Sequence, residues 1–247
     1  MHRSELIGQL NNLLHPEFFK DYAPNGLQVQ GKTEIRRIVT AVSATQNVID
    51  RAIELQADAL LVHHGWFWKN ENPTVTGTKY KRLKSILSTD MNLIAYHLPL
   101  DAHETLGNNA QMAKLLKATN VCGGQEGSFV WSGTIEPRSV RDLANFLSRA
   151  LNRQALVLGD ESLIVSRLAW CSGAAEDFFE SAIAMGAQTY ISGEATERTT
   201  HMARESGVPF LVCGHHATER LGIQALGIWI KENLALECVF VDDDNPI

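Results

Sequence analysis

The chain has 247 residues, of which 45% are apolar and 20% charged, and this composition indicates a globular protein with one large domain or two modest ones. Its formal net charge of -6 argues against a broad basic surface for nucleic acid, although a local basic patch is compatible with it. The start of the chain lacks the apolar run of a signal peptide, and no segment approaches the roughly 20 apolar residues that span a bilayer, so we expect a cytoplasmic protein that does not bind membranes.

The first half of the sequence predicts alternating helices and strands. The turn signal Ala23-Pro24-Asn25-Gly26 follows an opening amphipathic helix, and a βαβ unit comes next, whose second strand ends at His63. The expected elements are a helix over 4–14, strands over 27–31 and 35–42, a helix over 45–55, a strand over 59–62, a basic helix containing Lys79 to Lys84, a strand over 93–96 and a helix over 109–116.

The second half continues this alternation beyond Gly123-Gly124, which we interpret as a boundary or insertion point. Ser139 fits the N-cap of the next helix, and the acidic residues Asp242 to Asp244 are predicted to form a solvated tail. The expected elements are a helix from Ser139 through Leu151, strands over 155–158 and 164–171, a helix over 174–185, a strand over 189–191, a helix over 196–205, a strand over 210–213, a helix over 218–231 and a strand over 236–241.

The two halves also resemble each other. Residues 52–61 align without a gap with residues 182–191, and His63-His64 then falls opposite Gly193-Glu194. This favours an α/β protein with mixed sheets and two similar lobes related by a pseudo-dyad, although shared βαβ patterning explains so short a match equally well. We assign residues 1–124 to lobe 1, with a first set of metal-ligand candidates. Residues 125–247 form lobe 2, whose part from about residue 208 to 247 returns to complete the site.

Histidines and carboxylates follow three apolar strands at the points where the strands end, which is the edge where open α/β sheets place their sites. They are His63-His64, His97 with Asp101, and His215-His216 with Glu219. Because adjacent strand residues point to opposite faces, we expect His63 and His64 to serve two neighbouring ions. His215 and Glu219 are four residues apart, a spacing that places both on one helical face. Asp101 follows His97 after a Leu-Pro-Leu turn.

The donor types indicate the kind of metal. The four cysteines are scattered, so the ligands offered are imidazoles and carboxylates without a thiolate pair. This set suits divalent zinc, iron, manganese or nickel, in two open sites that share a bridging carboxylate. The sequence therefore predicts a catalytic type of metal centre, whose metal it does not identify.

Several of these features also have a structural explanation. A single histidine is more often a hydrogen-bonded core residue than a ligand, and only the combination of pairs favours metal binding. Trp66-Phe67-Trp68 can fill a core or a subunit contact as readily as stack on a substrate base. The helix of Lys79 to Lys84 is more often a solvated face than a phosphate site, and Gly193-Glu194 fits a turn as well as a carboxylate at the sheet edge.

Longer motifs occur in order along the chain. They are Pro24-Asn25-Gly26-Leu27-Gln28-Val29, Val62-His63-His64-Gly65, His97-Leu98-Pro99-Leu100-Asp101, Gly107-Asn108-Asn109, Gly193-Glu194 and Gly214-His215-His216-Ala217-Thr218-Glu219. Through them essentially the whole chain resembles the NGG-interacting-factor-three-like family of dinuclear-metal proteins, labelled GTP cyclohydrolase 1 type 2 homologues, and especially its short bacterial members.

The resemblance implies a site, a fold and an assembly. It implies two divalent metal ions per chain, with Glu219 bridging and His97 close by; the implied ligands are His63, His64, Asp101, His215 and Glu219. It also implies a three-layer α/β/α protomer of two similar lobes, and a homohexameric ring in which the metals face an inner cavity.

The expected function is metal-dependent hydrolysis of a nucleotide-like substrate. Catalytic roles fall to Glu219, which holds the ions, and to His97, which orients the nucleophile or moves a proton. The alternative is a metal-stabilised ring scaffold, linked to DNA damage and repair, without turnover; DNA as a partner requires basic residues collected inside the ring. A weaker alternative is metal storage or sensing.

Overall fold

The computed structural model describes residues 1–123 and 129–247, which form two compact units. The first unit consists of Met1–Leu100 and Ile223–Asp244, and the second of Asp101–Gly222 and Asn245–Ile247. The predicted lobe boundary at Gly124 lies outside the described residues. The division into lobes of 1–124 and 125–247, and their relation by a pseudo-dyad, therefore stay predictions.

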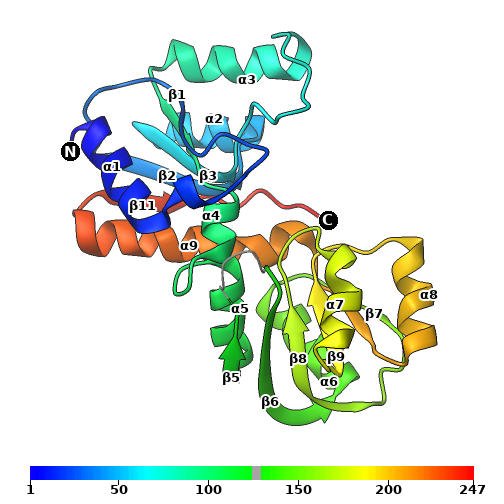
Figure 1. Cartoon of the computed structure of the whole chain (residues 1–247). Helices are drawn as coiled ribbons and strands as arrows, with labels where there is room; N and C mark the ends of the chain where they lie inside the picture. The colour runs from blue at the N-terminus through cyan, green and yellow to red at the C-terminus, as the bar shows by residue number, and fades with distance from the viewer. Residues whose placement is uncertain (124–128) are drawn as a thin grey trace. The chain divides into compact units, whose positions relative to one another are not determined.

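The first unit is built on a mixed sheet with the strand order β1-β4-β3-β2-β11 (Figure 1). β4, β3, β2 and β11 run parallel, and β1 is antiparallel to β4. β2 and β3 are buried along almost their whole length and consist mainly of apolar residues, because both faces of the sheet are covered. The strands are β1 (Gly26–Val29), β2 (Arg37–Ser43), β3 (Ala59–His64), β4 (Asn92–Ala95) and β11 (Glu237–Phe240).

Helices α2 and α3 lie on one face of this sheet, and the part of α9 from Ile223 lies on the other (Figure 1). Val48, Ile49 and Ile86 from α2 and α3 pack with strand residues such as Leu60 and Leu93 in one buried cluster. The helical elements that begin in this unit are α1 (Arg3–Leu14), the 3-10 helix η1 (Pro16–Phe18), α2 (Gln46–Glu54), α3 (Gly77–Ser88) and α4 (Leu98–Ala102).

The second unit contains a mixed sheet with the order β5-β6-β8-β9-β10-β7. β8, β9 and β10 run parallel, and the other pairings are antiparallel. Its strands are β5 (Thr119–Cys122), β6 (Trp131–Ser139), β7 (Leu156–Leu158), β8 (Ile164–Trp170), β9 (Thr189–Ser192) and β10 (Phe210–Val212). Its helical elements are α5 (Asn108–Leu116), α6 (Val140–Ala150), the 3-10 helix η2 (Glu176–Phe178), α7 (Phe179–Ala184), α8 (Glu197–Ser206) and the first part of α9 (His215–Leu234).

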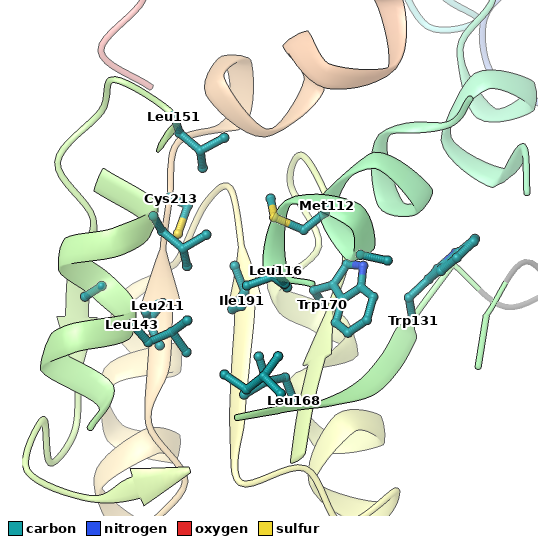
Figure 2. Packing of buried hydrophobic residues seen from close by; sticks show 14 of the residues in the cluster. Met112, Leu116, Trp131, Leu143, Leu151, Leu168, Trp170, Ile191, Leu211 and Cys213 are labelled. Carbon is teal, nitrogen blue, oxygen red and sulfur yellow. The ribbon is translucent and has the colours of Figure 1, made fainter. Parts of the chain in front are cut away.

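The core of this unit packs α5 and α6 against the sheet. Figure 2 shows Met112 and Leu116 of α5 close to Trp170 of β8, and Leu143 of α6 near Leu211 of β10. The Trp170 indole donates a hydrogen bond to the backbone oxygen of Asn109 (3.0 Å), so the core also fixes the start of α5. Ser139 caps α6 as predicted, because its hydroxyl accepts a hydrogen bond from the backbone N–H of Asp142.

Two local expectations were wrong, and one strand was not predicted. Residues 131–139 form the long strand β6, for which the sequence gave no prediction because polar residues interrupt its apolar pattern. The residues Leu98–Ala102 form a short helix rather than a turn, since Pro is tolerated in the first helical turn. α9 begins at His215 instead of Thr218, because Gly214, with a φ of 92°, ends the preceding segment and its carbonyl accepts from the Thr218 N–H.

These differences leave the predicted fold class intact. The α/β class with mixed sheets is confirmed by the two sheets and their covering helices. No helix in the described ranges is long and apolar enough to cross a membrane.

The acidic end of the chain is not simply solvated. Asp243 accepts hydrogen bonds from the Thr45 hydroxyl (2.5 Å) and the Asn47 amide (2.7 Å) at the start of α2. We expect Asp243→Ala to lower the free energy of unfolding by roughly 0.5–1.5 kcal/mol, because a charge-assisted contact at a helix N-terminus is lost. Urea unfolding measures this change, and the exposed Asp244→Ala is the control; equal stability of the two variants would contradict the contact.

Candidate metal centre

Three histidines of the first unit form one cluster. His63 and His64 end β3, and His97 follows β4, the neighbouring strand in the sheet. Their candidate ligand atoms lie within 4.8 Å of one another. The ring centroids are 4.6 Å apart for His63 and His64, 5.1 Å for His63 and His97, and 5.6 Å for His64 and His97. Adjacent side chains of a regular strand point to opposite faces, but the rings of His63 and His64 lie close together at the end of β3.

Each ring of this cluster is held at Nδ1. His63 Nδ1 lies 3.1 Å from the backbone oxygen of Tyr96, which can only accept, so this nitrogen has the proton and Nε2 is the ligand-type nitrogen. His64 Nδ1 lies 3.2 Å from the Ser43 hydroxyl, and His97 Nδ1 lies 2.9 Å from the carboxylate of Asp21. Anchoring of one ring nitrogen orients the other, as is usual for metal-binding histidines.

The second unit brings two carboxylates and one imidazole together. Oxygens of Asp101 and Glu219 lie within 4.8 Å of each other, and His215 Nε2 lies 3.1 Å from Glu219 Oε2. His215 and Glu219 share one face of the first turns of α9, as their spacing predicted. Glu194, two residues after the end of β9, contacts His215 Nδ1, so this carboxylate does lie beside a candidate ligand.

The charge state of His215 follows from these contacts. Burial would lower the pKa of the imidazole, but the hydrogen bonds and negative charges of Glu219 and Glu194 outweigh it and raise the pKa to about 9. The imidazole is therefore protonated at neutral pH in the metal-free protein. A cation can replace this proton as the partner of the two carboxylates.

Neutral side chains orient Asp101. The Asn108 amide donates to Asp101 Oδ1 (2.8 Å), and the Ser172 hydroxyl donates to the same oxygen (3.2 Å). The Asn108 carbonyl oxygen accepts from the backbone N–H of Gly222 in α9 (2.8 Å). Sequence reasoning quoted Asn108 only as part of a motif and missed Ser172, for which the sequence offers no signal.

A glycine makes room for the Glu219 carboxylate. Gly173 has a φ of 70°, and a Cβ at this position would overlap with Oε1 of Glu219. Its backbone N–H donates to the Thr218 hydroxyl (3.0 Å), which holds the loop against α9. Gly173 was also missed from the sequence, because nothing local distinguishes it from a turn glycine.

The aromatic and basic candidates separate into different environments. Trp66 is buried, and its indole donates to the Ala44 carbonyl (3.0 Å), so it is a core residue. Trp68 contacts the histidine cluster, with its ring 5.2 Å from that of His97. Lys79 pairs with Glu71 (3.4 Å) and lies 5.5 Å from the Phe67 ring centroid, so it already has protein partners.

The donor chemistry fits a divalent metal. Asp101 and Glu219 are 8% and 3% exposed, and two buried carboxylates this close repel each other unless a positive charge lies beside them. The three imidazoles of the first unit are neutral donors of the type that zinc, iron, manganese and nickel accept. The two units thus contain the imidazoles and carboxylates that the sequence predicted, each set assembled within its own unit.

Comparison with known proteins assigns the chain to a family. The model of the family Duf34/NIF3 (NGG1p interacting factor 3) matches residues 1–246, and the chain belongs to this family. The resemblance found from the motifs is thereby confirmed.

The relatives match over their whole length. Proteins named GTP cyclohydrolase 1 type 2 homolog are 45% identical in Vibrio cholerae and 47% identical in Escherichia coli K12, with complete coverage of both chains in each case. The solved structure of protein ybgI, described as of unknown function, is 46% identical with a TM-score of 0.95, and a structure from Thermus thermophilus is 30% identical with a TM-score of 0.90. Both structural matches also cover both chains completely.

Gly173→Ala tests the space beside Glu219. We expect it to weaken binding of divalent metal, because the new methyl group displaces the carboxylate. Gly207→Ala is a matched control, since Gly207 has a φ of 71° with no atom within 4 Å of the added Cβ. Both variants should lose roughly 1–2 kcal/mol of stability from the left-handed backbone. Isothermal titration calorimetry with Zn²⁺ measures the affinity of each variant. We expect a lower affinity only in Gly173→Ala, and equal affinities would contradict the role of Gly173.

Metal binding should depend on pH through His215. The protonated imidazole stabilises the metal-free protein fully below pH 6.5, and this contribution is lost as the pH rises through about 9. A metal must displace that proton, so its apparent affinity should rise by up to about tenfold per pH unit towards pH 9. Titrations of metal-free protein between pH 7 and 9 measure the slope. An affinity that does not change over this range would show that His215 is not a ligand.

Proposed function

We propose that the chain binds two divalent metal ions and uses them to hydrolyse a nucleotide-like substrate. The observation that carries the proposal is the type and burial of the donors: three imidazoles in the first unit, and two buried carboxylates with an imidazole in the second. The proposed ligands are His63, His64, Asp101, His215 and Glu219, with Glu219 as the bridging carboxylate. The proposal requires both sets of side chains to act on the same pair of ions.

The residues divide the work of hydrolysis between them. When bound, two ions lower the pKa of an attacking water and polarise the bond under attack. Asp101 and Glu219 balance the positive charge, and the hydrogen bonds from Asn108 and Ser172 keep the Asp101 carboxylate in one orientation. His97 is the proposed acid–base group: its Nε2 takes a proton from the attacking water and returns it to the leaving group.

The substrate class rests on the relatives and on the surroundings of the cluster. Proteins at 45–47% identity carry the name GTP cyclohydrolase 1 type 2 homolog, so a purine nucleotide is the first candidate. Tyr22 and Trp68 have rings 5.5 and 5.2 Å from that of His97, and aromatic rings of this kind can stack on a base. We further propose a homohexameric ring as the assembled form.

Elemental mass spectrometry on protein purified without added metal tests the centre. We expect about two ions per chain, and a loss of at least one in both His64→Ala and Glu219→Gln, since each removes a ligand from a different unit. His201→Ala is the control, because this histidine is exposed on α8. Two tightly bound ions in Glu219→Gln would falsify the bridging role.

The same preparations test turnover. Protein with two ions should hydrolyse nucleotides, GTP first, and Glu219→Gln should lose this activity by at least about a hundredfold. Two ions without turnover on any nucleotide would instead favour the metal-stabilised ring scaffold. In that case DNA binding with a steep salt dependence would support the link to DNA.

A further inference from the structure

Asp21 is a buried carboxylate directed at the histidine cluster of the first unit. It lies in the loop between η1 and β1, and its side chain is 3% exposed. Its Oδ1 accepts from the backbone N–H of Tyr22 (2.7 Å) and from His97 Nδ1 (2.9 Å), and its Oδ2 accepts from the backbone N–H of Leu98 (3.0 Å). A loop carboxylate thus bonds both the ring of His97 and the backbone that follows it.

Asn25 completes this arrangement. Its amide donates to Asp21 Oδ2 (3.0 Å), and its carbonyl oxygen accepts from the backbone N–H of His97 (2.8 Å). Two side chains of one short loop therefore fix the backbone and the ring of a single histidine. The following Gly26 begins β1, which pairs with Ala95 of β4, so the sheet holds the loop and His97 in register.

The His97 ring is also enclosed on its sides. Its centroid lies 5.5 Å from the ring of Tyr22 and 5.2 Å from that of Trp68, and the imidazoles of His63 and His64 lie 5.1 and 5.6 Å away. These contacts restrict rotation of the ring. With Nδ1 bonded to Asp21, the other ring nitrogen, Nε2, is the one available for chemistry beside the cluster.

We infer that Asp21 is a positioning residue for His97, which holds the proton of the imidazole on Nδ1 and keeps the Nε2 lone pair directed at the reacting groups. The inference rests on the proposed function for its catalytic consequence, but the placement of the proton does not. A carboxylate can only accept, so the bond to Nδ1 requires the proton on that nitrogen. In unrelated enzymes too, a buried carboxylate accepts a hydrogen bond from a catalytic histidine and fixes its tautomer.

The ionisation of Asp21 supports this role. Burial would raise its pKa, but hydrogen bonds from His97, Asn25 and the Leu98 backbone N–H outweigh burial and lower the pKa to about 2. The group is therefore an acceptor at every pH at which the folded protein would be studied.

Nitrogen NMR on histidine-labelled, zinc-loaded protein tests the placement directly, with His97→Gln to assign the signal. We expect His97 to show a protonated Nδ1 and an unprotonated Nε2. In Asp21→Asn the proton should move at least partly to Nε2, since an amide can also donate to Nδ1. A proton on Nε2 in the unmodified protein, or the same tautomer in both proteins, would overturn the inference.

A kinetic comparison separates positioning from general damage. Asp58→Asn is the matched control, because Asp58 is a comparably bonded carboxylate of the same unit, which pairs with Lys32 and accepts from the Arg36 and Arg37 backbone. Asp21→Asn should keep the metal content and KM of the unmodified protein while kcat falls by about 10²-fold or more. An unchanged kcat would overturn the catalytic consequence. If no substrate is hydrolysed at all, the proposed function fails, and the NMR result still decides the role of Asp21.

Discussion

The orientation of the imidazole rings is the constraint on which the candidate centre depends. A free histidine rotates and exchanges its proton between two nitrogens, so it offers no fixed donor direction. In the first unit, the Tyr96 carbonyl fixes His63, and Asp21 fixes His97. Tyr96 directly follows the adjacent strand β4, and Asp21 lies in the loop that precedes β1. The parallel register of β3 and β4 brings these histidines to one end of the sheet. The sheet thus determines the donor geometry before any ion binds.

In the second unit, the buried carboxylates of Asp101 and Glu219 lie close together. Burial of two like charges is unfavourable, and the structure offsets it with hydrogen bonds to Asp101 and with the protonated His215 beside Glu219. Gly173 gives the Glu219 carboxylate the space it needs. The electrostatic energy favours a divalent cation in this unit, because its two positive charges balance both carboxylates, whereas one imidazolium balances only one.

Sequence reasoning found the donors but not what holds them. The four histidines stood out at the ends of apolar strands, Glu219 at a helical spacing from His215, and Asp101 after the Leu-Pro-Leu turn that follows His97; the histidines are His63, His64, His97 and His215. Asp21, Ser172 and Gly173 did not, since their roles come from long-range contacts that no local pattern encodes. The βαβ order was predictable from apolar periodicity, whereas β6 was not, because it is a partly polar strand in an antiparallel pairing.

X-ray absorption spectroscopy on protein purified without added metal tests the central claim most directly. A dinuclear centre of imidazole and carboxylate ligands predicts nitrogen and oxygen neighbours at about 2.0–2.2 Å, multiple scattering from imidazole rings, and a metal–metal distance of roughly 3.5–4 Å. Sulfur neighbours at about 2.3 Å, or a metal edge without imidazole scattering and without a second metal, would contradict it.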